Sequence, residues 1–211
     1  DVGMCGRIDH VLCDAHFTVR MWMTFLDGRK KNMDEMKRID RVLKYKGAIV
    51  DVYDDVMQSP SGNIAHWDYV AHRKGAAAVL PVTEDGKILM VRQYRNALDR
   101  ETLEIPAGSR DSVEEPTSVC AARELEEETG YKAAHLELLI TVSTTVAFCN
   151  ETIDVYLATD LTKTQQHLDE DEFVEVESYT IEELKDMVLT QKIQDSKTVA
   201  AIMAYYGKYC I

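Results

Sequence analysis

The order of the predicted elements places this chain in the α+β class. Runs of β-forming residues fill its first part, one helix is predicted near the middle, and two more helices are predicted near the end. Strands and helices are therefore largely segregated along the chain, which differs from the regular alternation of a parallel α/β protein. The length of 211 residues suits one domain with a small extension or two small domains.

The first predicted strands form a separate N-terminal unit. Residues 1–22 show no clear period, and we expect a poorly ordered leader there. Residues 41–56 are rich in Val, Ile, Leu and Tyr, which predicts a strand. The turn-forming sequence Ser-Pro-Ser-Gly-Asn follows at 59–63, and 65–70 is predicted to return as a second strand. An antiparallel sheet is therefore expected over 41–72.

A second hairpin opens the larger part of the chain, residues 73–211. Residues 76–82 and 87–94 are its predicted strands, and the Asp-Gly pair at 85–86 suits the tight turn between them. Three further strands are predicted from their β-forming residues, at 136–143, 153–159 and 174–179.

Three helices are predicted from their end signals. The first runs from Pro116, which suits a first helical position, to Thr129, and ends at Gly130. The sequence Thr-Ile-Glu-Glu at 180–183 is a capping box that opens a short helix to about residue 189. Asp195 or Ser196 is expected to cap a last helix through residue 209.

The charge balance limits the classes of partner. Lys and Arg number 24 against 37 Asp and Glu, a net charge of −13, which argues against nucleic acids and anionic membranes as partners. The longest apolar stretch, 75–82, is too short to span a bilayer. The five cysteines are widely spaced without a Cys-x-x-Cys pair, so we expect free thiols and a cytoplasmic protein.

The predicted helix 116–129 carries an unusual charge pattern. Glu124, Glu126, Glu127 and Glu128 crowd its C-terminal half, where the helix dipole disfavours carboxylates. Glu124 and Glu128 also share one face and repel each other. A divalent cation between them would reverse the sign, and hard carboxylate oxygens select Mg²⁺ or Mn²⁺. The structural alternative is a solvated acidic face on an acidic protein.

The residues around this helix resemble the Nudix box of the Nudix hydrolases, Gly-x5-Glu-x7-Arg-Glu-U-x-Glu-Glu-x-Gly-U, where U is a bulky aliphatic or similar residue. The matching residues are Gly108, Arg123, Glu124, Leu125, Glu127, Glu128, Gly130 and Tyr131. The first half contains one extra residue, so either Glu114 or Glu115 is the first box glutamate. Residues 92–95, 103–108 and 168–173 are similar to the ADP-ribose pyrophosphatase branch of this family.

The resemblance implies a fold and an activity. The fold would be the Nudix α/β/α sandwich with a mixed sheet over 73–211, plus the N-terminal antiparallel sheet, which in this branch builds a homodimer. The activity would be Mg²⁺-dependent hydrolysis of a nucleotide-sugar, foremost ADP-ribose to AMP and ribose 5-phosphate, with Mn²⁺ as a possible substitute. Other ADP- or GDP-sugars, or an ADP-ribose-binding module that does not cleave, remain alternatives. Hydrolysis of oxidised nucleoside triphosphates is disfavoured by the long N-terminal sheet.

The resemblance also assigns roles to residues. Metal ligands would be Glu124, Glu127, Glu128, the carbonyl of Ala107, and Glu172. Catalysis is assigned to Glu170, as the base on a downstream loop, and to Glu127. Arg123 would orient the box glutamates, while Glu126 would face solvent.

Substrate contacts are expected upstream and downstream of the box. Arg95 would hold the diphosphate, since guanidinium binds phosphate through paired hydrogen bonds. Glu104 and Glu151 would contact ribose hydroxyls, and Trp67, with Tyr69 beside it, would stack on adenine. A surface or core role is the structural alternative for each. The basic cluster 72–74 (His-Arg-Lys) is expected to be a solvated loop.

Overall fold

A computed structural model describes residues 35–168 and 173–211. Within these residues the elements are β1 (Lys37–Lys46), β2 (Val50–Gln58), β3 (Ile64–His72), β4 (Ala76–Pro81), β5 (Ile88–Arg95), β6 (Arg100–Glu104), β7 (Ala107–Ser109), α2 (Thr117–Thr129), β8 (Tyr131–Ser143), β9 (Thr152–Lys163), β10 (Val174–Tyr179), α3 (Ile181–Leu189) and α4 (Ser196–Tyr209).

The described strands form three sheets. Their orders are β1-β2-β3, β10-β5-β6 and β7-β4-β9-β8. The β4–β9 pair is parallel, whereas β7 and β8 pair antiparallel to their neighbours, so the largest sheet is mixed. The predicted α+β class with a mixed sheet is confirmed.

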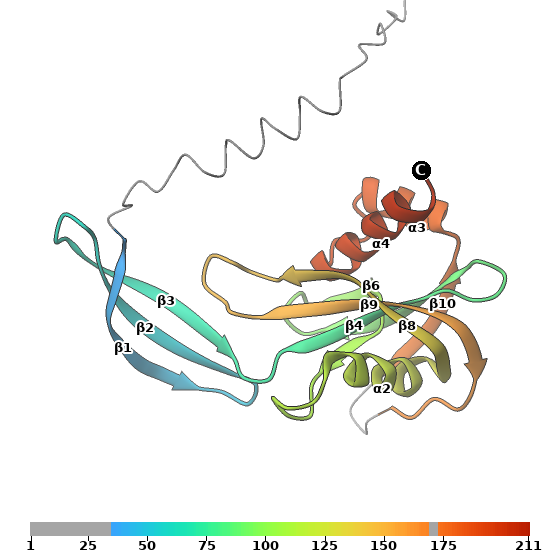
Figure 1. Cartoon of the computed structure of the whole chain (residues 1–211), viewed down its shortest axis with the longest axis horizontal. Coiled ribbons are helices and arrows are strands. Elements are labelled where there is room, and N and C mark those ends of the chain that lie inside the picture. Colours follow the sequence, from blue (N-terminus) through green and yellow to red (C-terminus); the bar gives the residue numbers. More distant parts are fainter. Residues whose placement is uncertain (1–34, 169–172) are drawn as a thin grey trace, which may run out of the picture.

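Helices cover both faces of the largest sheet, with α2 on one side and α3 and α4 on the other (Figure 1). Strand β4 is buried along its whole length and alternates between the two cores. Ala76, Ala78 and Leu80 pack with Ala201 and Ile202 of α4. The intervening residues Ala77 and Val79 pack with the buried face of α2, formed by Cys120, Ala121 and Leu125. This arrangement is the predicted three-layer sandwich.

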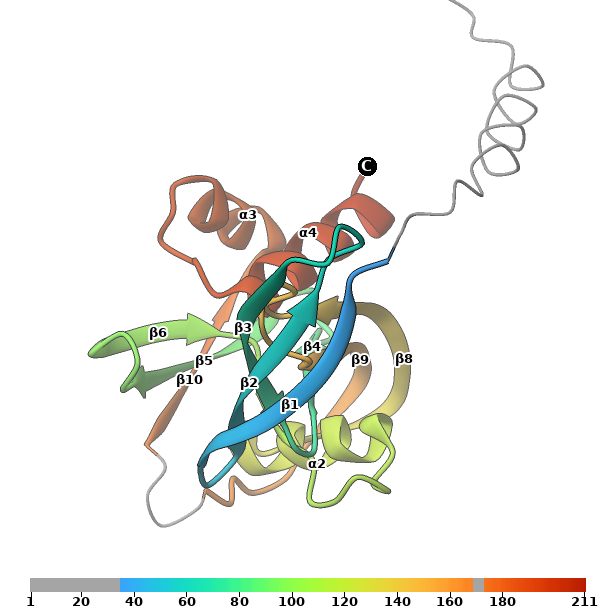
Figure 2. The same ribbon diagram turned by 90° about the vertical axis from the view of Figure 1, so that its left-hand side faces the viewer.

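The β1-β2-β3 sheet stands beside the sandwich and is seen face-on in Figure 2. The single strand predicted over 41–56 is wrong, because β1 and β2 are two antiparallel strands joined at residues 47–49. The Gly47 N–H donates to the Val50 carbonyl across 2.8 Å, which closes a tight turn. A Cβ on Gly47 would lie 2.7 Å from that oxygen, so glycine permits the turn. The predicted returning strand is confirmed as β3.

Two short strands were not predicted, and they position the site described below. Strand β6 pairs with β5, and the three-residue β7 pairs with β4. Charged residues at the start of β6 and Pro106 between the two strands weaken the β signal in the sequence. Their pairing with longer strands is what makes them strands.

The helix ends follow the local signals closely. Pro116 has extended backbone angles and precedes α2, so it is the N-cap and not the first helical residue. Gly130 ends α2 in the left-handed conformation, with φ 71°. The capping box of α3 is formed by Thr180 and Glu183, as predicted. For α4 the structure selects Asp195 as the N-cap, since its carboxylate accepts from the Thr198 N–H.

Candidate active site

Two glutamates of α2 lie against strand β7. The carboxylate of Glu124 occupies the space where a Cβ of Gly108 would be, so only glycine permits this contact. One turn further along α2, Glu128 accepts a hydrogen bond of 3.0 Å from the Ala107 N–H. Both glutamates are buried. Two carboxylates and the Ala107–Gly108 peptide are thus gathered at one point.

Arg123 holds the neighbouring carboxylates. Its Nη1 donates to Glu124 Oε1 at 2.6 Å and to Glu127 Oε2 at 2.8 Å, and its Nη2 donates to the Ser109 carbonyl at 3.0 Å. Burial by itself lowers the pKa of Arg123, but the adjacent carboxylates raise it above its ordinary value. A permanent cation therefore offsets the repulsion between glutamates that the helix alone would not tolerate.

The structure distinguishes the two candidates for the first box glutamate. Glu115 lies 3.5 Å from Arg123 Nε through its Oε1, and its Oε2 accepts from the Asp111 N–H at 2.7 Å. Glu114 is exposed. The extra residue is accommodated in the loop before α2, and Glu115 joins the Arg123 cluster. Glu126, expected to face solvent, is half-buried and pairs with Lys132 at 3.0 Å.

The donor set at β7 and α2 fits a hard divalent cation. Glu124, Glu128 and the adjacent backbone supply oxygen ligands, and Gly108 leaves the carboxylate in contact with the strand. In residues 35–168 and 173–211, no group of three His, Cys, Asp or Glu side chains is arranged to hold a metal ion. Arg123 engages the Glu127 carboxylate beside this site.

A second polar cluster surrounds Glu104, whose residue exposure is 2%. Its carboxylate accepts from Arg95 Nε at 2.8 Å and Nη2 at 2.7 Å, from Thr102 at 2.6 Å, and from Lys197 Nζ. Burial raises the pKa of Glu104, but the hydrogen bonds and charges of Arg95, Lys197 and Thr102 lower it overall to about 2. In this structure the Glu104 carboxylate contacts Arg95, and its expected contact with a ribose hydroxyl stays a prediction.

Glu151 lies in a third group at the end of β3. It accepts a hydrogen bond of 2.9 Å from Thr144, and its Oε1 is 3.6 Å from His72 Nε2. The expectation of a solvated loop over 72–74 agrees with Arg73 and Lys74, which are exposed in the connection between β3 and β4, but it is wrong for His72. The His72 side chain is 8% exposed and its Nδ1 accepts from the Gly75 N–H at 3.0 Å. Arg73 is held by Asp51 on β2.

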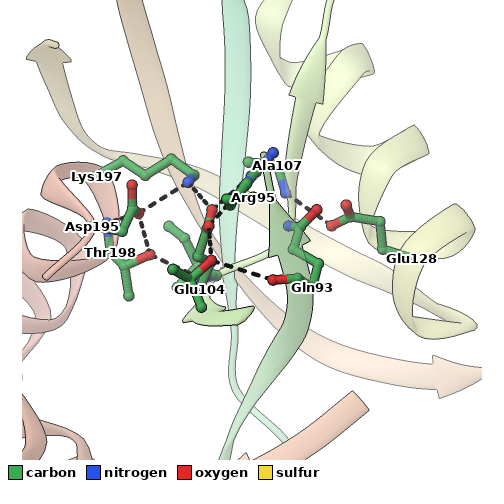
Figure 3. Close-up of polar contacts among 10 residues, drawn as sticks. Gln93, Arg95, Glu104, Ala107, Glu128, Asp195, Lys197 and Thr198 are labelled. Atoms are coloured by element: carbon green, nitrogen blue, oxygen red, sulfur yellow. Dashed lines mark hydrogen bonds and ion pairs between the residues drawn. The ribbon is translucent and has the colours of Figure 1, made fainter. Parts of the chain in front are cut away.

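One cavity of about 570 Å³ is lined by residues of the Glu104 and Glu151 groups and by Ala107 and Gly108, which contact the carboxylates of α2. Four of the lining residues were predicted for the site: Arg95, Glu104, Ala107 and Glu151. The lining also includes His72, Gly108, Asp195 and Lys197, which were not. Figure 3 shows the α4 residues on one side, Glu128 of α2 on the other, and Arg95 and Glu104 between them. Trp67 is not among the residues that line the cavity and is 50% exposed on β3. Glu170, Glu172 and the leader 1–22 lie outside the described residues.

Lys197 was not predicted, and Asp195 was predicted only as a helix cap, yet both line the cavity. The sequence did contain a signal for Lys197. A lysine in the first turn of a helix is disfavoured by the helix dipole, which indicates that another interaction keeps it there.

The family model of the NUDIX domain matches residues 72–202. The chain belongs to the Nudix family. The match begins at the end of β3 and covers the sandwich, so the β7–α2 site lies within the Nudix domain.

Relatives with assigned names support this placement. The Nudix chain is 41% identical over 174 residues to "ADP-ribose pyrophosphatase" of Bacillus subtilis (strain 168), covering 82% of this chain and 92% of that protein. It is 40% identical over 170 residues to "Methanol dehydrogenase activator" of Bacillus methanolicus, covering 80% and 91%. A solved structure, "Crystal structure of ADP compounds hydrolase", shares the fold with a TM-score of 0.76 at 18% identity, covering 86% of this chain and all of that one. Residues 35–168 and 173–211 contain no helix with the length and hydropathy needed to cross a bilayer.

Proposed function

We propose that this Nudix hydrolase cleaves ADP-ribose to AMP and ribose 5-phosphate. The observation that carries the proposal is the position of the Glu124 and Glu128 carboxylates at the Ala107–Gly108 edge of a cavity that also presents Arg95. Carboxylates and an arginine at one cavity suit a diphosphate that arrives with divalent cations. The 41% identity to a protein named ADP-ribose pyrophosphatase supports the choice of substrate.

The proposed metal ligands are Glu124, Glu128 and the carbonyl of Ala107, with Mg²⁺ as the ion and Mn²⁺ as a substitute. Bound Mg²⁺ would neutralise charge on the diphosphate. Arg123 orients Glu124 and Glu127 through its two hydrogen bonds. Glu127 and Glu172 remain proposed as further ligands.

The chemistry is the transfer of a phosphoryl group to water. A water oxygen attacks one phosphorus, the bond from that phosphorus to the bridging oxygen breaks, and a base accepts the proton of the water. Glu170 remains the proposed base, with Glu127 as the second proposed catalytic glutamate. Arg95 would bind the diphosphate and Glu151 a ribose hydroxyl, since both line the cavity.

We propose a homodimer built through the β1-β2-β3 sheet. This sheet exposes large apolar side chains, including Leu43 at 48% and Trp67 at 50% exposure, which a stable monomer would normally cover. Trp67 would then stack on adenine only from a position that dimerisation creates. The free thiols of Cys120, Cys149 and Cys210 support the cytoplasm as the location.

The proposal is tested by incubating the purified chain with ADP-ribose and Mg²⁺ and measuring AMP by chromatography. Glu124→Gln and Glu128→Gln are expected to lower kcat by about a hundredfold or more, because each removes one charged ligand. Glu126→Gln is the matched control on the same helix, since Glu126 pairs with Lys132.

If the wild-type chain releases no AMP with either Mg²⁺ or Mn²⁺, the proposed hydrolysis is wrong. Binding of ADP-ribose without AMP release would then identify the non-cleaving module. A panel of ADP- and GDP-sugars in the same assay separates ADP-ribose from the other nucleotide-sugars, because the pocket beyond the metal ligands determines that choice.

A further inference from the structure

Lys197 occupies a place where a lysine is costly. It is the second residue of α4, and a cation in the first helical turn opposes the helix dipole. Its side chain is only 8% exposed. Removing an ammonium group from water is unfavourable unless a partner compensates the lost hydration. The structure supplies that partner in Glu104.

A continuous set of charged contacts runs along the cavity wall from Lys197 through Glu104 to Arg95. Lys197 Nζ donates to Glu104 Oε2 and to Asp195 Oδ2, the latter at 2.9 Å. Glu104 in turn accepts two hydrogen bonds from Arg95, through Nε and Nη2. Figure 3 shows Lys197, Glu104 and Arg95 in this order, from α4 to the strand that carries Arg95.

The contacts define the geometry of the Arg95 guanidinium. A paired hydrogen bond to one carboxylate sets both the position and the plane of the group. Glu104 can serve as this anchor because it stays ionised, and its own charge is shared between two cations. The pair of Arg95 and Glu104 is neutral by itself, and Lys197 adds a second positive charge at the Glu104 carboxylate. Asp195, which accepts from Lys197 while it caps α4, formally balances this added charge.

We propose that Lys197 is a positioning residue for the substrate: it holds Glu104, and Glu104 holds the Arg95 guanidinium at the cavity edge where the diphosphate binds. The assignment of the ligand rests on the proposed function. Lys197 acts through Glu104, because its described hydrogen bonds go to Glu104 and Asp195. An arginine that is already oriented loses less freedom on binding, so the device strengthens substrate binding more than it accelerates the chemical step.

The test uses three variants of the full chain. Lys197→Met removes the charge and keeps a similar length, and Lys197→Arg keeps the charge. Lys192→Met is the control, since Lys192 is an exposed lysine on the connection between α3 and α4. Lys197→Met is expected to raise KM for ADP-ribose about tenfold with kcat changed less than about threefold, Lys197→Arg to recover part of the loss, and Lys192→Met to change neither.

A double-mutant cycle separates action through Glu104 from direct contact with the substrate. In a Glu104→Gln background, adding Lys197→Met is expected to change KM less than about twofold, because the anchor is already lost. A further tenfold rise in this background would show that Lys197 contacts the substrate itself, and would overturn the proposal.

A measurement made without substrate tests the positioning role of Lys197 independently of the proposed hydrolysis. Phenylglyoxal labelling of Arg95, followed by peptide mass spectrometry, is expected to be several-fold faster in Lys197→Met than in the wild type or Lys192→Met, because a loosened ion pair protects the guanidinium less. An unchanged labelling rate overturns the positioning role whatever the substrate is. Faster labelling in a chain that neither binds nor cleaves ADP-ribose supports the role of Lys197 and refutes the proposed function.

Discussion

Gly108 and Glu124 are in direct contact, and the carboxylate of Glu124 fills the volume that a side chain at position 108 would need. The contact joins β7 to α2 at the point where the Ala107–Gly108 peptide meets two buried carboxylates. The glycine of the Nudix box therefore has a steric reason in this chain, since a Cβ at position 108 would overlap the Glu124 carboxylate and force that side chain to move.

Gly108→Ala tests this contact. The added methyl group would displace the Glu124 carboxylate, so we expect kcat/KM for ADP-ribose to fall by about a hundredfold or more. Gly207→Ala is the control, because a Cβ at Gly207 meets no atom within 4 Å and alanine suits a helix. Steady-state AMP release measures both variants, with circular dichroism to show that each is folded. Full activity in a folded Gly108→Ala chain would contradict the steric argument.

The pair Glu114 and Glu115 gives a second prediction. Glu115→Gln weakens the ionic contact with Arg123 and is expected to lower kcat by about tenfold, because Arg123 also orients Glu124 and Glu127. Glu114→Gln changes the same net charge at an exposed position and is expected to keep full activity. AMP release by the two variants, measured side by side, decides between them. The reverse order of effects would assign the box glutamate to position 114.

Because of Glu104, the free energy of unfolding is expected to fall as the pH is lowered below about 4.5. Burial raises the pKa of Glu104, but Arg95, Lys197 and Thr102 lower it from an ordinary 4.5 to about 2. A lowered pKa in the folded state stabilises the protein above about pH 4.5, and this contribution is lost as the pH falls towards 2. The full effect corresponds to about 3 kcal/mol, of which about 2 kcal/mol is lost by pH 3.

Urea unfolding of the wild type and Glu104→Gln at pH 6 and pH 3 measures this contribution. We expect the difference between the two free energies of unfolding to shrink by about 2 kcal/mol at the lower pH, because the wild type loses the ionised carboxylate. A difference that is the same at both pH values would show that Glu104 is not held ionised by its partners.

The exposed face of the N-terminal sheet yields a prediction on assembly. Leu43→Glu places a charge on the apolar face of β1 and is expected to convert a wild-type dimer into a monomer, measured by light scattering after size-exclusion chromatography. Leu189→Glu introduces the same change at an exposed position at the end of α3 and should leave the dimer intact. A monomeric wild type at micromolar concentration would refute the proposed homodimer.

The predicted elements with strong local signals agree with the structure. Gly130 ends α2, Thr180 and Glu183 form the capping box of α3, and β10 has the predicted bounds 174–179. The helix ends depend on residues close together in the chain, so their free energies are decided locally. Strand β10 has a clear β-forming sequence of its own, although it pairs with the distant β5. The box pattern also placed Arg123, Glu124 and Glu128 on one helix, and the structure brings them to one site.

The remaining features depend on partners distant in the sequence. Strand β7 exists because it pairs with β4, and the turn at Gly47 separates two strands that composition alone joins into one. Glu104 lies in a segment that resembles the family, so the sequence identified it as a candidate. Its burial, its low pKa and its pairing with Lys197 exist only in the folded chain, because Lys197 is 93 residues away in the sequence. The sequence by itself determined the family, the helix that carries the carboxylates and its ends. Only the tertiary structure decided which charges meet, because an ion pair acquires its partner and its low-dielectric surroundings together, when distant segments pack.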